Sequence, residues 1–381
     1  MQEAFIDHPR QLADFCRALE EAPWLAVDTE FHRERTYYPE LCLIQVSDGR
    51  RAACIDPLAL EDLTPLAERL LDPAITKVFH AGRQDLEIFL QLWGRLPAPV
   101  FDTQPAAALL GLGDQLGYGS LIQRLLGVEL AKDHSRTDWS QRPLDQAQIR
   151  YALDDVIYLG QAYERMVARL EELGRLEWLA PEFETLTDPA TYHQDPHTLW
   201  QRVKGRQHLK GVRLAVLQAL AAWREEQAQA RNKPRRWILK DEVLLELARR
   251  MPTHPRELAR IRGLENGFIK QWGNELLELI AQARRRPKEE WPREKPRPRP
   301  LSEEQEAVVD ILGGALRLLA HQAGLSPQLI GGRKELAALV RRDPNARLLQ
   351  GWRRHLAGEP LQALLQGNHH IELTDGTPRL R

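Results

Sequence analysis

The feature that most constrains this chain is an apolar segment that ends in two acids. Residues 24–27, WLAV, have the composition of a buried strand, and the chain continues directly through Asp28 and Glu30. Carboxylates two residues apart on a strand point to the same face of the sheet. Because two like charges buried side by side are costly, we expect a cation to lie between them.

The first 170 residues alternate between strand-like and helix-like patterns. Short apolar runs predict five strands, at 23–31, 40–47, 51–55, 75–80 and 99–102. Apolar residues at helical spacing predict helices at 62–71, 83–92, 105–110, 118–126 and 145–170. The first three strands follow one another and helices then alternate with strands, an order that predicts a mixed α/β sheet with helices on its faces.

Beyond residue 205 the strand pattern is lost. Apolar residues at helical spacing continue over 209–228, 241–250 and 274–283, and a last helical block follows from about 301 to 366. Between them, residues 287–300 (PKEEWPREKPRPRP) are rich in proline and charge and predict a semi-rigid, extended linker.

The two helical blocks resemble each other. Trp237–Pro252 aligns with Leu329–Pro344 at an offset of 92 residues, with matching leucines and a shared Arg-Arg-x-Pro ending. This similarity indicates a duplicated module. A chance match between two leucine-rich helices is the alternative.

The charge is distributed unevenly along the chain. Residues 1–195 carry 18 Lys and Arg against 33 Asp and Glu, whereas residues 196–381 carry 35 against 21. This asymmetry predicts an acidic part with its own activity and a basic part that meets a polyanion. Alternatively, two surfaces of opposite sign could dock on each other.

Cysteine content and hydropathy bound the environment of the protein. The chain has three scattered cysteines, so neither a disulfide framework nor a zinc site is indicated. No apolar run approaches the roughly 18 residues that span a bilayer, and no signal-peptide pattern is present. We therefore expect a cytoplasmic protein with no membrane partner, and nothing in the sequence indicates an obligate protein partner.

Two further acids and a tyrosine can join the strand pair. Asp85 lies where a predicted strand turns into a helix, and Asp155 lies inside the predicted helix 145–170, four residues after Tyr151 and on the same face. Each pattern alone is common, because a D-x-E at a strand end is more often a surface turn. Together they predict a carboxylate cage of the kind that holds Mg²⁺ or Mn²⁺.

The segments AVDTEF, FHAGRQDLEIF and YALDDV resemble the three exonuclease motifs of the DEDD superfamily. The third motif is similar to the variety with tyrosine, because the sister variety has histidine five residues before the last Asp and this chain has Arg150 there. Two further segments resemble the ribonuclease D family more closely: TEFHRERTYYPELCLIQVS and KDHSRTDWSQRPL. Residues 208–286 resemble the helical HRDC module of that family, and residues 301–375 do so mainly through the repeat.

The resemblance implies a ribonuclease-H-like α/β exonuclease domain followed by two all-α HRDC-type domains. The boundaries would be 1–200 for the exonuclease, 207–286 for the first HRDC domain, 287–300 for the linker and 301–375 for the second, HRDC-like domain. It also implies metal-dependent 3′→5′ hydrolysis that releases 5′-mononucleotides with two divalent ions, Mg²⁺ or Mn²⁺.

The resemblance also implies a role for each of the four acids and for the tyrosine. Asp28, Glu30 and Asp155 would hold the first ion. Asp28 would also reach the second, and Asp85 would act on that side largely through water. Tyr151 would orient the attacking water rather than act as a strong base, since a free tyrosine has a pKa near 10.

Four side chains are candidates for substrate contact. Phe31 and His32 directly follow the acid pair, and aromatic faces stack on bases without sequence preference. Strand alternation, however, also allows Phe31 to pack under the sheet. Lys132 and Arg136, in a polar loop, could contact backbone phosphates or belong to an ordered surface loop. GLGDQLGYG, at 111–119, lacks the strand and the Gly-Lys-Ser/Thr of a phosphate-binding loop and predicts only a turn between helices.

These patterns together predict an exoribonuclease that trims the 3′ ends of tRNA precursors and other small structured RNAs. The basic segments 202–213 and 231–240 of the helical part would contact phosphates, although a solvated helix face is the alternative for any single residue. Two other functions stay open: a DNA exonuclease of the same superfamily, and an RNA-binding protein with an inactive nuclease fold. A contact to the 2′-hydroxyl would separate RNA from DNA.

Overall fold

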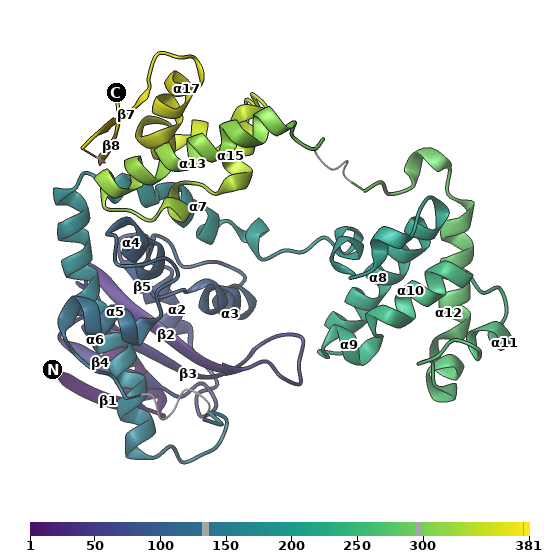
Figure 1. Ribbon diagram of the computed structural model, residues 1–381. Coiled ribbons are helices and arrows are strands. Elements are labelled where there is room, and N and C mark those ends of the chain that lie inside the picture. Colours follow the sequence, from purple (N-terminus) through teal and green to yellow (C-terminus); the bar gives the residue numbers. More distant parts are fainter. Residues whose placement is uncertain (132–136, 295–298, 376) are drawn as a thin grey trace. The chain divides into compact units, whose positions relative to one another are not determined.

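The computed structural model describes residues 1–131, 137–294, 299–375 and 377–381. The chain forms two compact units. One contains residues 1–30, 42–189 and 299–381, and the other contains residues 31–41 and 190–298 (Figure 1).

The first unit is built on a six-stranded mixed sheet with the order β1-β4-β3-β2-β5-β6. Strands β1 and β4, β2 and β5, and β5 and β6 pair in parallel, whereas β3 and β4 pair antiparallel. The strands are β1 (Gln2–Ile6), β2 (Trp24–His32), β3 (Glu40–Ser47), β4 (Arg51–Ile55), β5 (Thr76–Phe79) and β6 (Val100–Asp102). The strand that carries the two acids, β2, therefore lies inside the sheet between β3 and β5.

The helices of the α/β part follow the predicted order. They are α1 (Pro9–Ala18), α2 (Thr64–Leu70), α3 (Arg83–Trp93), α4 (Thr103–Leu109), α5 (Tyr118–Leu126) and α6 (Gln146–Glu172). The five predicted strands and five predicted helices are confirmed within a few residues. Strand β1 and helix α1 were not predicted. β1 lies at the sheet edge and buries only Ile6 fully, so its sequence lacks a continuous apolar run.

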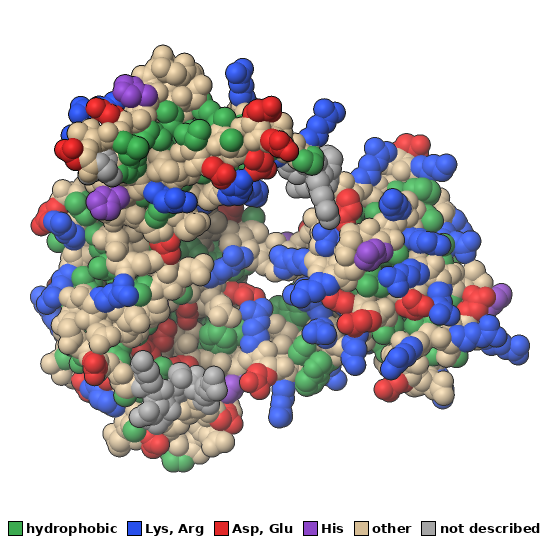
Figure 2. All heavy atoms as spheres, viewed as in Figure 1, with side chains coloured by type: hydrophobic (Ala, Val, Ile, Leu, Met, Phe, Trp, Pro, Cys, Tyr) green, Lys and Arg blue, Asp and Glu red, His purple; other side chains and the backbone are tan. Residues whose placement is uncertain are grey.

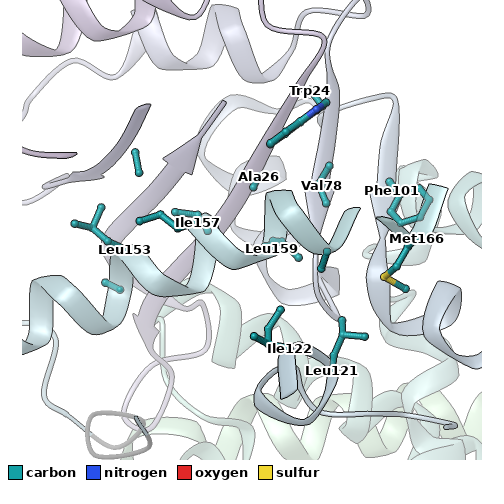
Figure 3. Packing of buried hydrophobic residues seen from close by; sticks show 14 of the residues in the cluster. Trp24, Ala26, Val78, Phe101, Leu121, Ile122, Leu153, Ile157, Leu159 and Met166 are labelled. Atoms are coloured by element: carbon teal, nitrogen blue, oxygen red, sulfur yellow. The ribbon is translucent and has the colours of Figure 1, made fainter. Parts of the chain in front are cut away.

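Helix α6 packs across the face of the sheet that carries the acids. Its start is stabilised by a capping box, in which the Asp145 carboxylate accepts from the backbone N–H of Gln148 and the Gln148 side chain accepts from that of Asp145. Figure 3 shows α6 side chains, among them Ile157 and Leu159, packed with Trp24 and other residues of β2 and β5 in one hydrophobic core. This packing holds α6 against β2.

The second unit is helical. Its elements are η3 (Pro196–Arg202), η4 (Arg206–His208), α8 (Val212–Ala230), α9 (Arg235–Ile238), α10 (Asp241–Arg250), α11 (Pro255–Leu258), α12 (Asn266–Arg285) and η5 (Lys288–Glu290). Helix α8 is buried along most of its length, and its Glu225 is fully buried. Residues 31–41 belong here: the Tyr37 hydroxyl donates to Glu225, and Asn232 Oδ1 accepts from the backbone N–H of Tyr37 at 3.0 Å.

The last helical block belongs to the first unit. It contains α13 (Glu303–Ala323), α14 (Pro327–Ile330), α15 (Arg333–Val340), η6 (Arg347–Leu349), α16 (Gly351–Arg353), η7 (Arg354–Gly358), α17 (Glu359–Leu365), β7 (Ile371–Thr374) and β8 (Thr377–Leu380). The rings of Trp178, in η1 (Leu176–Leu179), and Trp352 stack with centroids 4.8 Å apart. Arg175 Nη2 donates to the Ala323 carbonyl oxygen at 2.5 Å. The block is therefore packed onto the α/β part, next to α7 (Ala180–Thr187).

The two aligned segments of the repeat have the same local structure. The short helix α9 and the longer helix α10 begin 92 residues before α14 and α15, respectively. Each segment also has a residue of positive φ just after its longer helix, Met251 at 47° and Arg342 at 57°, although these two positions are one residue apart in the alignment. This agreement supports a duplication. No helix among the described residues is long and apolar enough to cross a bilayer.

Two glycines inside helices allow a test of this packing. A Cβ on Gly160 of α6 would lie 2.4 Å from Cη2 of Trp24, whereas a Cβ on Gly314 of α13 meets nothing within 4 Å. We expect Gly160→Ala to destabilise the protein by about 1–3 kcal/mol through overpacking. Gly314→Ala should stabilise it by roughly 0.5–1 kcal/mol, because alanine loses less backbone entropy. Urea unfolding followed by circular dichroism measures both. An unchanged midpoint for Gly160→Ala would contradict the close approach of α6 and β2.

Candidate active site

Three acids from two elements form a group that could hold a cation. Asp28 and Glu30 lie on β2 and Asp155 lies on α6, and one carboxylate oxygen from each lies within 4.8 Å of the others. The pair on β2 shares a face because strand side chains alternate. Asp155 meets this pair because the core packing places α6 over that face.

Asp85 lies beside this group but is not one of the three. It is in the first turn of α3 and is buried, and its Oδ1 accepts a 2.5 Å hydrogen bond from the Thr29 hydroxyl. Thr29 stands between Asp28 and Glu30 on β2, so this strand orients Asp85 as well as carrying the pair. The sequence-predicted acids are therefore brought together, with Asp85 held through Thr29.

Burial raises the pKa of each of these carboxyls, and repulsion adds to it: from Asp102 for Asp85, from Asp154 for Asp155, and from other acids of the group for Asp28 and Glu30. Burial is the largest cause in every case. The pKa of Asp28 is raised well above its ordinary value, with added repulsion from Asp85, Asp155 and Glu30. The pKa rises to about 8 for Glu30, about 7 for Asp155 and about 6 for Asp85. These four acids therefore resist being ionised at the same time. A bound divalent cation would lower that resistance by stabilising the ionised carboxylates.

Tyr151 lies one helical turn before Asp155 and is half-buried. Its ring lies 6.1 Å from that of Trp139, measured between centroids. Burial and the charges of Asp155, Glu30 and Asp28 raise the pKa of its hydroxyl above the ordinary value. The phenol therefore stays protonated at neutral pH and is available as a hydrogen-bond donor.

A cavity of about 570 Å³ opens beside the acids. Asp28, Tyr151 and Asp155 line it, together with His80 and residues 117–120 and 129–131. A pocket of this size falls in the range that holds a nucleotide-sized ligand. The segment 111–119, predicted only as a turn, thus supplies part of a cavity wall.

His80 is a wall residue that the sequence analysis missed. Its Nδ1 lies 2.9 Å from Thr103 Oγ1, and that hydroxyl also hydrogen-bonds the Phe79 carbonyl oxygen. Burial lowers the pKa of His80 to about 4, so its ring is neutral at physiological pH. Its position in the sequence, directly after β5 and five residues before Asp85, could have identified it as a site residue.

The remaining candidates fall into two groups. Phe31 and His32 are the last residues of β2 and are half-buried. Lys132 and Arg136 lie outside the described residues.

Arg150, which replaces the histidine of the sister motif, makes ion pairs with Glu3 at 2.8 Å and Asp154 at 2.6 Å.

The donor set fits a hard divalent cation. All four acidic side chains offer oxygen, the ligand type that Mg²⁺ and Mn²⁺ prefer, and the cavity leaves room for water or substrate oxygens to complete the coordination. Burial raises the pKa of all four carboxyls, and a bound cation would favour their ionised forms.

Residues 4–171 match the family described as 3′-5′ exonuclease, and residues 213–280 match the HRDC domain. The fold and the acid group thus define a 3′-5′ exonuclease that carries an HRDC domain. The chain is 44% identical over 380 residues to ribonuclease D of Gluconacetobacter diazotrophicus, covering 98% of this chain and 95% of that protein. It is 42% identical over 370 residues to ribonuclease D of Pseudomonas paraeruginosa, covering 95% and 97%.

A solved structure agrees with these relatives. The crystal structure of Escherichia coli RNase D, an exoribonuclease involved in structured RNA processing, aligns with a TM-score of 0.80 and 34% identity, over 96% of this chain and 99% of that one. The chain belongs to the ribonuclease D family. The predicted family and the predicted fold class, an α/β exonuclease domain followed by helical modules, are confirmed.

Metal binding should release protons and strengthen with pH. The acids keep protons when no ion is present, because their pKa values lie at about 6 to 8 or above, and a metal ligand must be deprotonated. We expect the affinity for Mn²⁺ to rise from pH 6 to pH 8, with about two to three protons released per site at pH 7. Calorimetry in buffers of different ionisation enthalpy measures the number. An affinity that stays constant over this range would contradict the raised pKa values.

Proposed function

We propose that this chain is a metal-dependent 3′→5′ exoribonuclease that releases 5′-mononucleotides and trims the 3′ ends of tRNA precursors and other small structured RNAs. The observation that carries the proposal is the group of three carboxylates beside a nucleotide-sized cavity, in a chain of the ribonuclease D family. The catalytic residues in this proposal are Asp28, Glu30, Asp85, Tyr151 and Asp155.

Two divalent ions, Mg²⁺ or Mn²⁺, are the proposed cofactors. Asp28, Glu30 and Asp155 would hold the first ion. Asp28 would also contact the second, with Asp85 on that side through water. When bound, such a pair stabilises the attacking and the leaving oxygens of an in-line phosphodiester displacement. The raised pKa values of the four acids support this assignment, because a bound cation favours the ionised form of an acid whose burial opposes ionisation.

Tyr151 acts by position in this proposal. Its raised pKa keeps the hydroxyl protonated, so it donates a hydrogen bond that orients the attacking water or a phosphate oxygen. Its place on the cavity wall, one turn from Asp155, supports that role. Phe31, His32, Lys132 and Arg136 stay predicted substrate contacts.

The charge of the helical modules supports a division of labour between them. Residues 201–300 carry 25 Lys and Arg against 12 Asp and Glu, whereas residues 301–381 carry 10 against 9. The first HRDC domain, 207–286, and the linker at 287–300 would therefore bind the structured body of the RNA, and the exonuclease domain, 1–200, would act on its free end. The nearly neutral domain at 301–375 would shape the molecule.

The proposed activity is tested with a 5′-labelled RNA hairpin that has a short unpaired 3′ tail. We expect shortening from the 3′ end with Mg²⁺ or Mn²⁺, and a loss of at least about 10³-fold with EDTA or in Asp155→Asn, because one carboxylate of the metal group is removed. Asp154→Asn is the matched control: this acid is adjacent on α6 but pairs with Arg150, and the variant should keep the parent rate within about twofold.

Two outcomes would replace the proposal. Intact RNA in every lane, with a salt-sensitive gel shift, would make the chain an RNA-binding protein. Faster digestion of a DNA strand of the same sequence would make it a DNA exonuclease.

The role of Tyr151 has its own test. Tyr151→Phe keeps the ring and removes the donor, so we expect kcat to fall about 10- to 100-fold with little change in KM or in Mn²⁺ affinity. Steady-state kinetics on the hairpin and a Mn²⁺ titration measure the three quantities. A rise in KM at constant kcat would instead assign Tyr151 to uniform substrate binding.

A further inference from the structure

A second cavity, of about 1090 Å³, lies within the helical unit. The start of α8 and the residues before it form one wall. The segment that follows α12 forms the other. The lining residues that matter are Arg206, Lys210, Gly211, Lys288, Trp291 and Arg293. The exonuclease site and the family match do not account for this cavity.

The wall after α12 is folded back against the domain. The sequence predicted an extended linker from residue 287, but residues 288–290 form a 3₁₀ turn and Trp291 Nε1 donates to the Arg286 carbonyl oxygen at 3.0 Å. Arg286 in turn donates from Nη1 to Gln218 of α8 at 3.0 Å. These bonds fix residues 286–291 beside α8.

Gly211 lets the Trp291 ring approach. Gly211 has a φ of +58°, and a Cβ there would lie 3.3 Å from Cζ3 of Trp291. Further along the segment, Arg206 and Glu294 form an ion pair at 2.9 Å. The cavity therefore has two ordered walls, each tied to the other by its own contacts.

The lining is strongly basic. Arg206, Lys210, Lys288 and Arg293 supply four cationic groups, and Glu294 is the single acid among the lining residues. With Arg206 paired to Glu294, three positive charges remain, and their side chains are exposed. Figure 2 shows Lys and Arg side chains over much of the visible surface of this unit. Three like charges gathered around one hollow favour an anion with several negative groups.

The chemistry of the walls selects among anions. Trp291 adds a half-buried aromatic ring at the same cavity, which suits a base or a sugar face next to phosphates. Cations on both walls of a large opening can contact more than one phosphate of a strand. We propose that this cavity is a binding site for the phosphodiester backbone of the RNA body. The inference rests on the proposed function, since it takes RNA as the substrate.

The test uses the full-length chain with Asp28→Ala, so that bound RNA is not digested. Lys210→Gln, Lys288→Gln and Arg293→Gln are combined in one variant. Arg317→Gln, Lys334→Gln and Arg342→Gln form the matched control, because they remove the same charge from exposed positions of the nearly neutral domain at 301–375. Fluorescence anisotropy with the hairpin RNA is measured from 50 to about 200 mM salt, the range over which phosphate contacts change affinity most.

We expect the cavity variant to bind about 10- to 100-fold more weakly at low salt and to lose about two units of slope in log Kd against log salt. The control should change the affinity less than about threefold. Equal losses in the two variants would overturn the site. A parent protein that does not bind the hairpin at all would overturn the proposed RNA substrate together with it.

A second measurement uses the chain without cavity substitutions and so does not depend on their folding. Amine acylation followed by mass spectrometry reports how RNA protects each lysine. Lys210 and Lys288 should be protected by the hairpin, and Lys334, an exposed lysine of the domain at 301–375, should not. Protection that is the same at all three lysines, or absent from all three, would contradict the proposal.

Discussion

The structure depends on the gathering of four acidic side chains at one place. Asp28, Glu30, Asp85 and Asp155 come from β2, α3 and α6; Asp85 is buried, and the other three are partly exposed. Such an arrangement opposes folding unless the surrounding packing is strong. The core between α6 and the sheet supplies that packing, with Trp24 and Gly160 in close approach. Burial and repulsion both disfavour the ionised carboxylates, and a bound cation would offset both effects.

The same local sequence can serve two purposes in one chain. The helices α9 and α10 recur as α14 and α15, but the first pair stands in a basic segment and the second in a nearly neutral one. The second block instead carries Trp352, which stacks on Trp178, and Leu329, which packs at the edge of the exonuclease core. The second block therefore has an aromatic and aliphatic docking face where the first block has an excess of positive charge. The two helical blocks thus differ in surface: the first is basic, and the second packs onto the α/β part.

Much of the exonuclease domain could be predicted because residues close together in the sequence determine its strands and helices. The alternation of WLAV into Asp28 and Glu30 defines β2, and the four-residue spacing of Tyr151 and Asp155 defines one face of α6. Strand β1 escaped prediction because an edge strand needs little apolar sequence. The cavity wall at 117–120 and His80 escaped because they gain meaning only once α5 is placed beside the acids, which is a contact between segments far apart in sequence.

The segment after α12 shows the same limit from the opposite side. Its proline and charge content favours an extended chain, and for a free peptide that expectation is sound. One tryptophan changes the outcome, because Trp291 finds the space that Gly211 leaves and a carbonyl acceptor at Arg286. Burying part of an indole ring offsets the entropy lost by a few ordered residues. Composition averages over the segment, whereas this contact depends on two positions about 80 residues apart. A charged, proline-rich stretch can therefore be linker in composition and still form the wall of a binding site.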